Sequence, residues 1–163
     1  MPKIMQPHSS GVGSGIPEVQ YMQHTSGSTF IRGAVLVYSS GEVAEGGANP
    51  TEIVGVALAD AGSAPGYNAA NSPSPITGRA AKVAVARAAA TTVFKATLTN
   101  NSSTRIAPAV ADIGVQYGLT AYSGVWTVDK NKTGGNARVE VVGIDLDQNY
   151  VLFKFLNSAI STD

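Results

Sequence analysis

The chain has 163 residues, a length that fits one domain, or one domain with an arm, and that can bury a core without disulfides or metals. It contains no cysteine, which excludes disulfides, cysteine-ligated zinc and a thiol nucleophile. Eleven basic and eleven acidic residues balance, and no Lys/Arg run occurs, so we expect no direct partnership with nucleic acid.

Charged residues make up 13% of the chain, against roughly 25% in an average soluble domain. Two interpretations of this low charge stay open. Part of the surface is hidden against partners, or small Ala, Gly, Ser and Thr side chains cover the exterior.

Residues 1–28 are predicted to form a flexible N-terminal arm that is extended and makes contacts. Residues 9–15 are serines and glycines with one valine, so they cannot bury enough apolar area to order alone. The N-terminus lacks the apolar region of a secretory signal, and no run approaches the ~18 apolar residues of a membrane helix. We therefore expect no membrane partner.

Residues 29–157 alternate β-branched or aromatic segments with turn-rich ones, which predicts a β-domain followed by a tail at 158–163. A long loop rich in Pro, Gly and Asn is expected over residues 61–80. Eight strands are expected, at residues 30–38, 53–58, 82–87, 92–98, 115–120, 125–128, 138–144 and 150–156. Without a convincing amphipathic helix, the fold class is all-β, a compact antiparallel β-barrel or sandwich with a flexible N-terminal arm.

Side-chain alternation predicts which faces are buried. Phe94, Ala96 and Leu98 share one face of their strand, and Val139 and Val141 point inward in theirs. The last strand is apolar on nearly both faces, which predicts that a layer, an arm or a neighbouring subunit covers its outer side.

No residues converge on a catalytic or metal site, so we expect no enzyme, cofactor or metal. The two histidines, His8 and His24, have no metal spacing, and residues 11–15 lack the ending of a phosphate loop. Residues 145–149 carry oxygen ligands at alternate positions but lack the glycine and glutamate of a calcium loop, so they are interpreted as a hairpin turn. Trp126 between valines indicates core rather than a sugar-stacking platform.

The C-terminal third resembles a known family. The segments that carry the resemblance are residues 117–120 (YGLT), 124–130 (GVWTVDK), Thr133 and 137–143 (ARVEVVG), with residues 30–37 and 53–57 fitting the same pattern. In this order they are similar to head-decoration (capsid cement) proteins of tailed bacteriophages, over about a third of the chain.

The resemblance implies a non-enzymatic virion structural protein on the outer capsid surface, made in the host cytoplasm. It would act as a homotrimer that stabilises the mature capsid by bridging subunits of the major capsid protein. Shell contact is expected from the residues least able to fold alone. These expected capsid-contact residues are Pro2, Lys3, Ile4, Met5, Gln6, Pro7, His8, Tyr21 and His24.

Two alternatives stay open. One is another virion β-module, such as a head-fibre base or a tail component. The other is a carbohydrate-binding module that uses Trp126 with a tyrosine such as Tyr67 or Tyr122.

Overall fold

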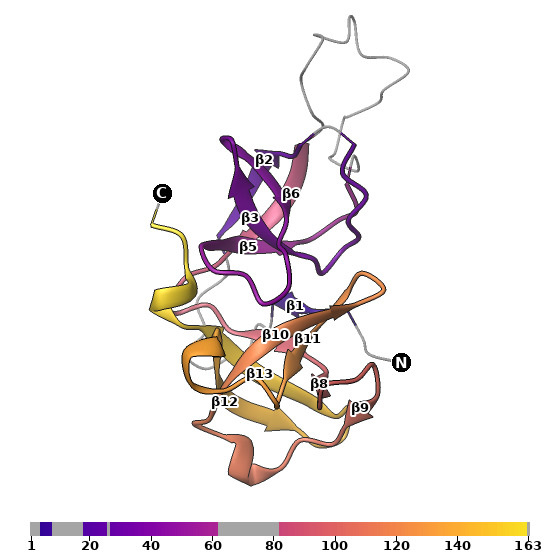
Figure 1. Cartoon of the computed structure of the whole chain (residues 1–163), viewed down its shortest axis with the longest axis vertical. Helices are drawn as coiled ribbons and strands as arrows, with labels where there is room; N and C mark the ends of the chain where they lie inside the picture. Colours follow the sequence, from indigo (N-terminus) through magenta and orange to yellow (C-terminus); the bar gives the residue numbers. More distant parts are fainter. Residues whose placement is uncertain (1–3, 8–17, 26, 62–81, 163) are drawn as a thin grey trace, which may run out of the picture.

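The computed structural model describes residues 4–7, 18–25, 27–61 and 82–162. Regular structure in these residues is β-strand with three short 3-10 turns, which confirms the all-β fold class. The strands form a five-stranded sheet and an eight-stranded sheet, one above the other in Figure 1.

The five-stranded sheet has the order β2-β6-β5-β3-β4 and is antiparallel. Its strands are β2 (Val19–Gln23), β3 (Val35–Ser39), β4 (Glu42–Glu45), β5 (Ile53–Ala57) and β6 (Lys82–Arg87). The central strand β5 is buried along its whole length. At the end of β2, His24 forms a bridge to Val43 of β4, so the two edge strands of this sheet meet there.

The eight-stranded sheet closes into a barrel because one segment, residues 94–99, pairs with both β13 (Tyr150–Phe155) and β11 (Val125–Asp129). The first half of this segment, β7 (Phe94–Ala96), pairs with β13, and its second half, β8 (Leu98–Thr99), pairs in parallel with β11. The chain between the halves is also bonded, since the Val128 amide donates to the Thr97 carbonyl. We call this unit the barrel.

Two further strands, β10 (Gln116–Tyr122) and β12 (Val139–Asp145), complete the barrel wall between β11 and β13. Two short strands lie on its margins, β1 (Gln6–Pro7) against β7 and β9 (Arg105–Ile106) against β8. The 3-10 turns are η1 (Val110–Asp112), η2 (Gly134–Asn136) and η3 (Asn157–Ala159).

Two tight hairpins are made by the same dipeptide. Ser40-Gly41 joins β3 to β4 and Ser123-Gly124 joins β10 to β11, and all four residues have positive φ. Two-residue turns with positive φ at both positions match the right-handed twist of the flanking strands. The sequence therefore fixes these two registers locally.

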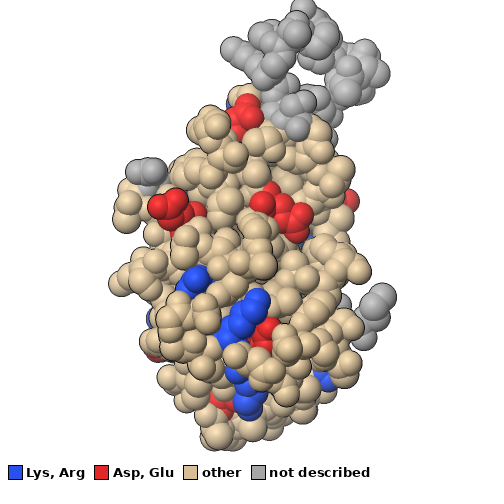
Figure 2. Space-filling model, in the orientation of Figure 1, with Lys and Arg blue, Asp and Glu red and all other residues tan. Residues whose placement is uncertain are grey.

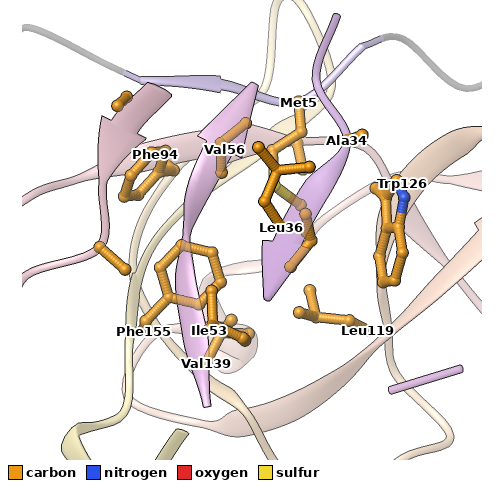
Figure 3. Packing of buried hydrophobic residues seen from close by; sticks show 14 of the residues in the cluster. Met5, Ala34, Leu36, Ile53, Val56, Phe94, Leu119, Trp126, Val139 and Phe155 are labelled. Carbon is orange, nitrogen blue, oxygen red and sulfur yellow. The ribbon is translucent and has the colours of Figure 1, made fainter. Parts of the chain in front are cut away.

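One hydrophobic core runs through both units. Leu36, Ile53 and Val56 of the five-stranded sheet, together with Met5, lie against Phe94, Leu119, Trp126, Val139 and Phe155 of the barrel (Figure 3). Phe94, Phe153 and Phe155 contact one another with ring centroids 5.1–6.0 Å apart. Since the apolar interior is shared, we expect the two units to unfold as one.

Polar contacts also join the units. The Asn49 side chain, in the loop before β5, accepts from the Leu119 amide and donates to the Asn136 carbonyl, both at 2.8 Å. Arg138 donates to the Asn49 and Pro50 carbonyls. Near the C-terminus, the Ser161 amide donates to the Ile53 carbonyl at 2.9 Å.

Most of the expected strands are found, and the departures have local causes. The strand expected at 30–38 starts at Val35, because Gly33 adopts φ +90° within a turn. The strand expected at 92–98 divides at Thr97, where its neighbours change. The short strands β4 and β9 were not expected.

The predicted boundary of the arm is corrected. Residues 4–7 and 18–25 fall within the expected arm, yet β1 belongs to the barrel and β2 to the five-stranded sheet. The expected tail also contacts the fold, because Ile160 forms a β-bridge with Ile53 of β5. Residues 1–3, 8–17 and 26 of the expected arm and residues 62–80 of the expected loop lie outside the described residues.

The burial predictions are confirmed on the inward faces. Phe94, Ala96, Leu98, Val139 and Val141 have no exposed surface. The outer side of the last strand is covered partly by the chain itself. The ammonium of Lys95 lies 5.2 Å from the centroid of the Tyr150 ring, and the Arg105 guanidinium lies 5.8 Å from it.

Gly118 in β10 is a position where a side chain cannot be accommodated without movement. A Cβ there would lie 2.5 Å from Lys132 Cβ, 2.7 Å from the Asn136 carbonyl oxygen and 2.8 Å from Asn49 Oδ1. We expect Gly118→Ala to lower the free energy of unfolding by about 1–3 kcal/mol, as overpacking does. Urea unfolding monitored by Trp126 fluorescence measures this, with Gly135→Ala, where a Cβ meets nothing within 4 Å, as the matched control. Equal midpoints for the two variants would contradict the expectation.

Candidate functional site

The structure separates the expected contact residues into four groups. Pro2, Lys3 and His8 lie outside the described residues. Ile4 and Tyr21 are exposed, at 38% and 56% of their surface, while Gln6 and Pro7 are half-buried in β1.

Met5 and His24 are buried, which corrects their assignment to a contact surface. Met5 has no exposed surface and His24 only 5%. The His24 ring lies edge-on to Phe30, with centroids 5.5 Å apart, and its Nδ1 is 2.9 Å from the Thr25 carbonyl oxygen. Both side chains therefore pack in the interior and are not part of the exposed surface.

Trp126 is a core residue, as its flanking valines indicated. It is 1% exposed, and its indole Nε1 donates to Glu45 Oε1 of the five-stranded sheet at 2.8 Å. A ring that is enclosed on both faces offers no platform for a sugar. The tryptophan on which the carbohydrate-binding alternative depended is therefore unavailable, and Tyr67 lies outside the described residues.

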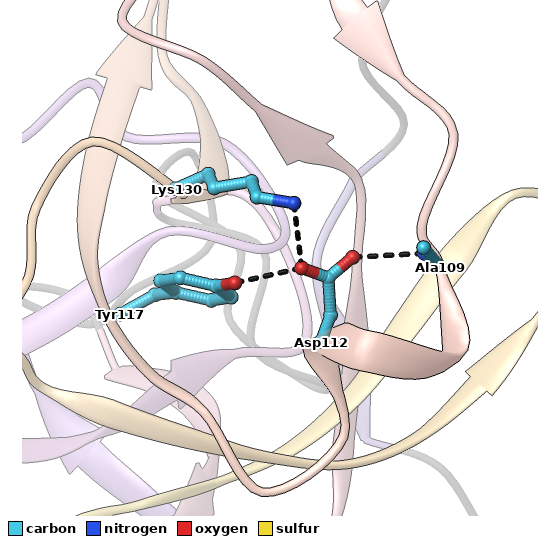
Figure 4. Close-up of polar contacts among 4 residues, drawn as sticks. All are labelled: Ala109, Asp112, Tyr117 and Lys130. Atoms are coloured by element: carbon cyan, nitrogen blue, oxygen red, sulfur yellow. Dashed lines mark hydrogen bonds and ion pairs between the residues drawn. The ribbon is translucent and has the colours of Figure 1, made fainter.

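The side chain of Asp112 is the centre of a polar cluster at the end of η1, and only 2% of it is exposed. Its Oδ1 accepts from the Tyr117 hydroxyl and from Lys130 Nζ, both at 2.7 Å, and its Oδ2 accepts from the Ala109 amide at 2.8 Å (Figure 4). Three donors from three parts of the chain thus fix one carboxylate. Sequence reasoning did not find this cluster, because no local pattern joins residues 112, 117 and 130.

The protonation states in this cluster follow from its geometry. Burial alone would raise the pKa of Asp112, but the hydrogen bonds from Lys130, Tyr117 and Ala109 and the charge of Lys130 outweigh it, so its pKa lies below the usual value. Burial, together with donation to the Asp112 carboxylate and the negative charge of that group, raises the pKa of Tyr117 well above its usual value. At neutral pH the cluster therefore holds a carboxylate that accepts a hydrogen bond from a neutral phenol, which suits anchoring.

A second buried carboxylate, Asp129, lies at the end of β11. Its Oδ2 accepts from Thr120 Oγ1 at 2.8 Å, and its Oδ1 accepts from the amides of Asn101 and Asn131 at 3.1 and 3.0 Å. Lys132 donates to the Thr120 hydroxyl and to the Leu119 carbonyl. These contacts fix the turns at this end of the barrel, so this cluster also has a positioning role.

Apolar side chains next to the Asp112 cluster are exposed to solvent. Val110 and Ile113, on either side of Asp112, are 72% and 45% exposed. The Gly114 amide donates to the Val141 carbonyl, which brings the end of this turn beside Val142, itself 38% exposed at a β-bulge of β12. We call Val110, Ile113 and Val142 the apolar turn surface. It was not recognised in the sequence, where its residues lie in two separate segments.

The charges on the face shown in Figure 2 are unevenly distributed. Acidic side chains gather over the five-stranded sheet and basic ones over the barrel. Two acidic residues of the barrel, Asp112 and Asp129, are buried and add no acidic surface there.

Within the described part of the chain, no three His, Asp or Glu side chains gather as metal ligands would. The carboxylate of Asp145, in the hairpin turn expected at 145–149, accepts from the Gln148 amide at 2.9 Å. None of the described helical segments has the length and hydrophobicity needed to cross a membrane.

Comparison of the chain with protein-family models, with curated protein sequences and with solved structures yields no match.

The lowered pKa of Asp112 predicts a pH-dependent contribution to stability. A carboxyl whose folded pKa lies below its unfolded value of about 3.9 stabilises the fold above that pH, and the contribution is lost as the pH falls through the folded pKa. We expect Asp112→Asn to lower the free energy of unfolding by about 1–2 kcal/mol at pH 7, because the charge-assisted bonds are lost. The difference from the wild type should shrink below about pH 4.

Urea unfolding at pH 7 and at pH 3 measures this difference. Asp147→Asn is the control, since Asp147 is an exposed acidic residue of the loop between β12 and β13. A deficit for Asp112→Asn that is the same at both pH values would contradict the expectation.

Proposed function

We propose that this chain is a non-enzymatic structural protein of a tailed-phage virion, which decorates the outer surface of the mature capsid and stabilises it. In this proposal it bridges subunits of the major capsid protein and works as a homotrimer. The observation that carries the proposal is the resemblance of residues 117–143 to head-decoration proteins. The segments of this chain that carry the resemblance lie next to one another in space.

The resembling segments form neighbouring strands of one wall. Residues 117–120 lie in β10 and residues 124–130 include β11, which pairs with it from Gly118↔Asp129 to Tyr122↔Val125. Residues 137–143 lead into β12, which pairs with β10 at Tyr117↔Val139. A resemblance that covers contiguous strands is better support than one scattered over the fold.

The surface chemistry also supports a binding role. The apolar turn surface is held rigid by the buried Asp112 cluster, so little conformational entropy would be lost when it is covered. We infer that this surface contributes to contact with the shell. Many symmetry-related copies would each add a modest contact, which together give avidity.

The proposed function can be tested by the oligomeric state of the protein and by its binding to heads. We expect the full-length protein to be a trimer by light scattering, and to co-sediment with expanded heads of the phage that encodes it but not with its precursor heads. Failure to bind expanded heads would overturn the proposed function. Antibody label on the tail or at isolated vertices would favour another virion module instead.

The role of the apolar turn surface can be tested by substitution. We expect Val110→Ser/Ile113→Ser to weaken binding to expanded heads by about tenfold or more, since loss of two buried aliphatic contacts is worth at least ~1.4 kcal/mol. Because both side chains are exposed, the unfolding midpoint should change little. Leu146→Ser, which removes an isolated exposed aliphatic side chain, is the matched control. Unchanged binding by the double variant would remove this surface from the contact.

A further inference from the structure

Residues 4–7 fill a slot between the two units of the fold. Gln6 and Pro7 lie antiparallel to Lys95 and Phe94 of β7, and the side chain of Met5 is fully buried in the shared core. In Figure 1 β1 lies at the level where the five-stranded sheet meets the barrel, and Figure 3 shows Met5 close to Leu36 and Ala34. This short segment therefore completes the core.

The opposite wall of the slot is shaped to the backbone of this segment. Gly33 has φ +90°, and a Cβ on it would lie 2.2 Å from Ile4 Cγ2 and 2.8 Å from the Met5 carbonyl oxygen. The Gly33 amide donates to the Ala57 carbonyl at 2.8 Å, which fixes the turn in this position. The slot thus accepts an extended backbone that carries a long apolar side chain at the position of Met5.

No local pairing ties β1 to the strand that follows it. β1 belongs to the barrel and β2 to the five-stranded sheet, so the two do not form a hairpin. Ten residues, 8–17, separate β1 from Glu18, and six of them are glycine or serine. A fully extended chain of ten residues spans at most about 33–36 Å. The contacts in the slot are identical whichever copy supplies the segment.

The described surface offers little else to hold copies together. Its seven exposed large hydrophobic residues are separated into small groups: Ile4, Val19 and Tyr21 near the N-terminus, the apolar turn surface, and Leu146. A stable interface buries on the order of 1,000 Å² or more, and its centre is apolar. Exchange of β1 would supply that apolar centre from the core itself, and exchange is a low-cost route to oligomers.

We propose that the slot between β7 and the Gly33 turn is a strand-acceptor site, and that residues 4–7 of a second copy of this chain occupy it in the assembled protein. Passed from each copy to the next, the segment makes a heterologous contact that closes into a ring of three. This inference rests on the homotrimer of the proposed function, but it does not depend on capsid binding.

The absence of cysteine from the chain allows a direct test with the full-length protein. Gln6→Cys and Lys95→Cys replace residues directly opposite each other, at a spacing suited to a disulfide. The double variant is refolded, oxidised, and run on a denaturing gel without reductant. Exchange predicts covalent species of two and three chains that return to one chain on reduction. Gln6→Cys/Lys154→Cys is the control, because Lys154 pairs with Glu140 and not with β1.

A monomeric band that carries an internal disulfide would overturn the exchange. If light scattering still showed a trimer in that case, the proposed function would be unaffected. Covalent trimers together with no binding to heads would leave the exchange standing and sink the proposed function instead.

A second variant covers the outcome in which the cysteines disturb folding. Met5→Ser weakens the segment that occupies the slot. Exchange predicts that this variant shifts from trimer to monomer at protein concentrations at which the wild type stays assembled. A Met5→Ser protein that is less stable but fully trimeric would overturn the proposal.

Discussion

The structure depends on an apolar core that neither of its two units could complete alone. The five-stranded sheet contributes Leu36, Ile53 and Val56, and the barrel contributes Phe94, Trp126 and Phe155. Small sheets bury too little apolar area to be stable by themselves, and they gain stability only when another layer covers them. The contacts between the units follow from this need. They include the hydrogen bonds of Asn49 and the buried side chain of Met5.

Closure of the barrel is the second constraint, and it decides where polar groups are buried. Strand β11 pairs with β8 on one edge and with β10 on the other, and both of its faces are buried, with Thr127 and Asp129 fully buried beside Trp126 and Val128. Buried polar side chains are costly unless they are hydrogen-bonded. Thr127 Oγ1 accordingly lies 2.9 Å from Thr99 Oγ1, and Asp129 accepts three bonds. The polar clusters are therefore consequences of the fold that also stiffen its turns.

The two proposals use different parts of this architecture. The apolar turn surface lies on a rigid turn at one end of the barrel, where a fixed shape favours binding to another surface. The slot for residues 4–7 lies at the junction of the two units, where the segment contributes to the core. Contact with a shell and contact between copies would then use separate surfaces, so that one need not compete with the other.

The sequence by itself determined the elements that short-range chemistry controls. Period-2 alternation indicated the inward faces of the strands around Phe94 and Val139, and glycine-containing turns marked most strand ends. Composition and the absence of cysteine indicated an all-β fold without disulfides. The tertiary structure alone decided which strands are neighbours, because pairing between distant segments leaves no local trace. Residues 4–7 and 18–25 were assigned to an arm for this reason, since their partners β7 and β6 lie 59 or more positions further along the chain. The Asp112 cluster and the apolar turn surface likewise exist only once the barrel brings residues 112, 117, 130 and 142 together.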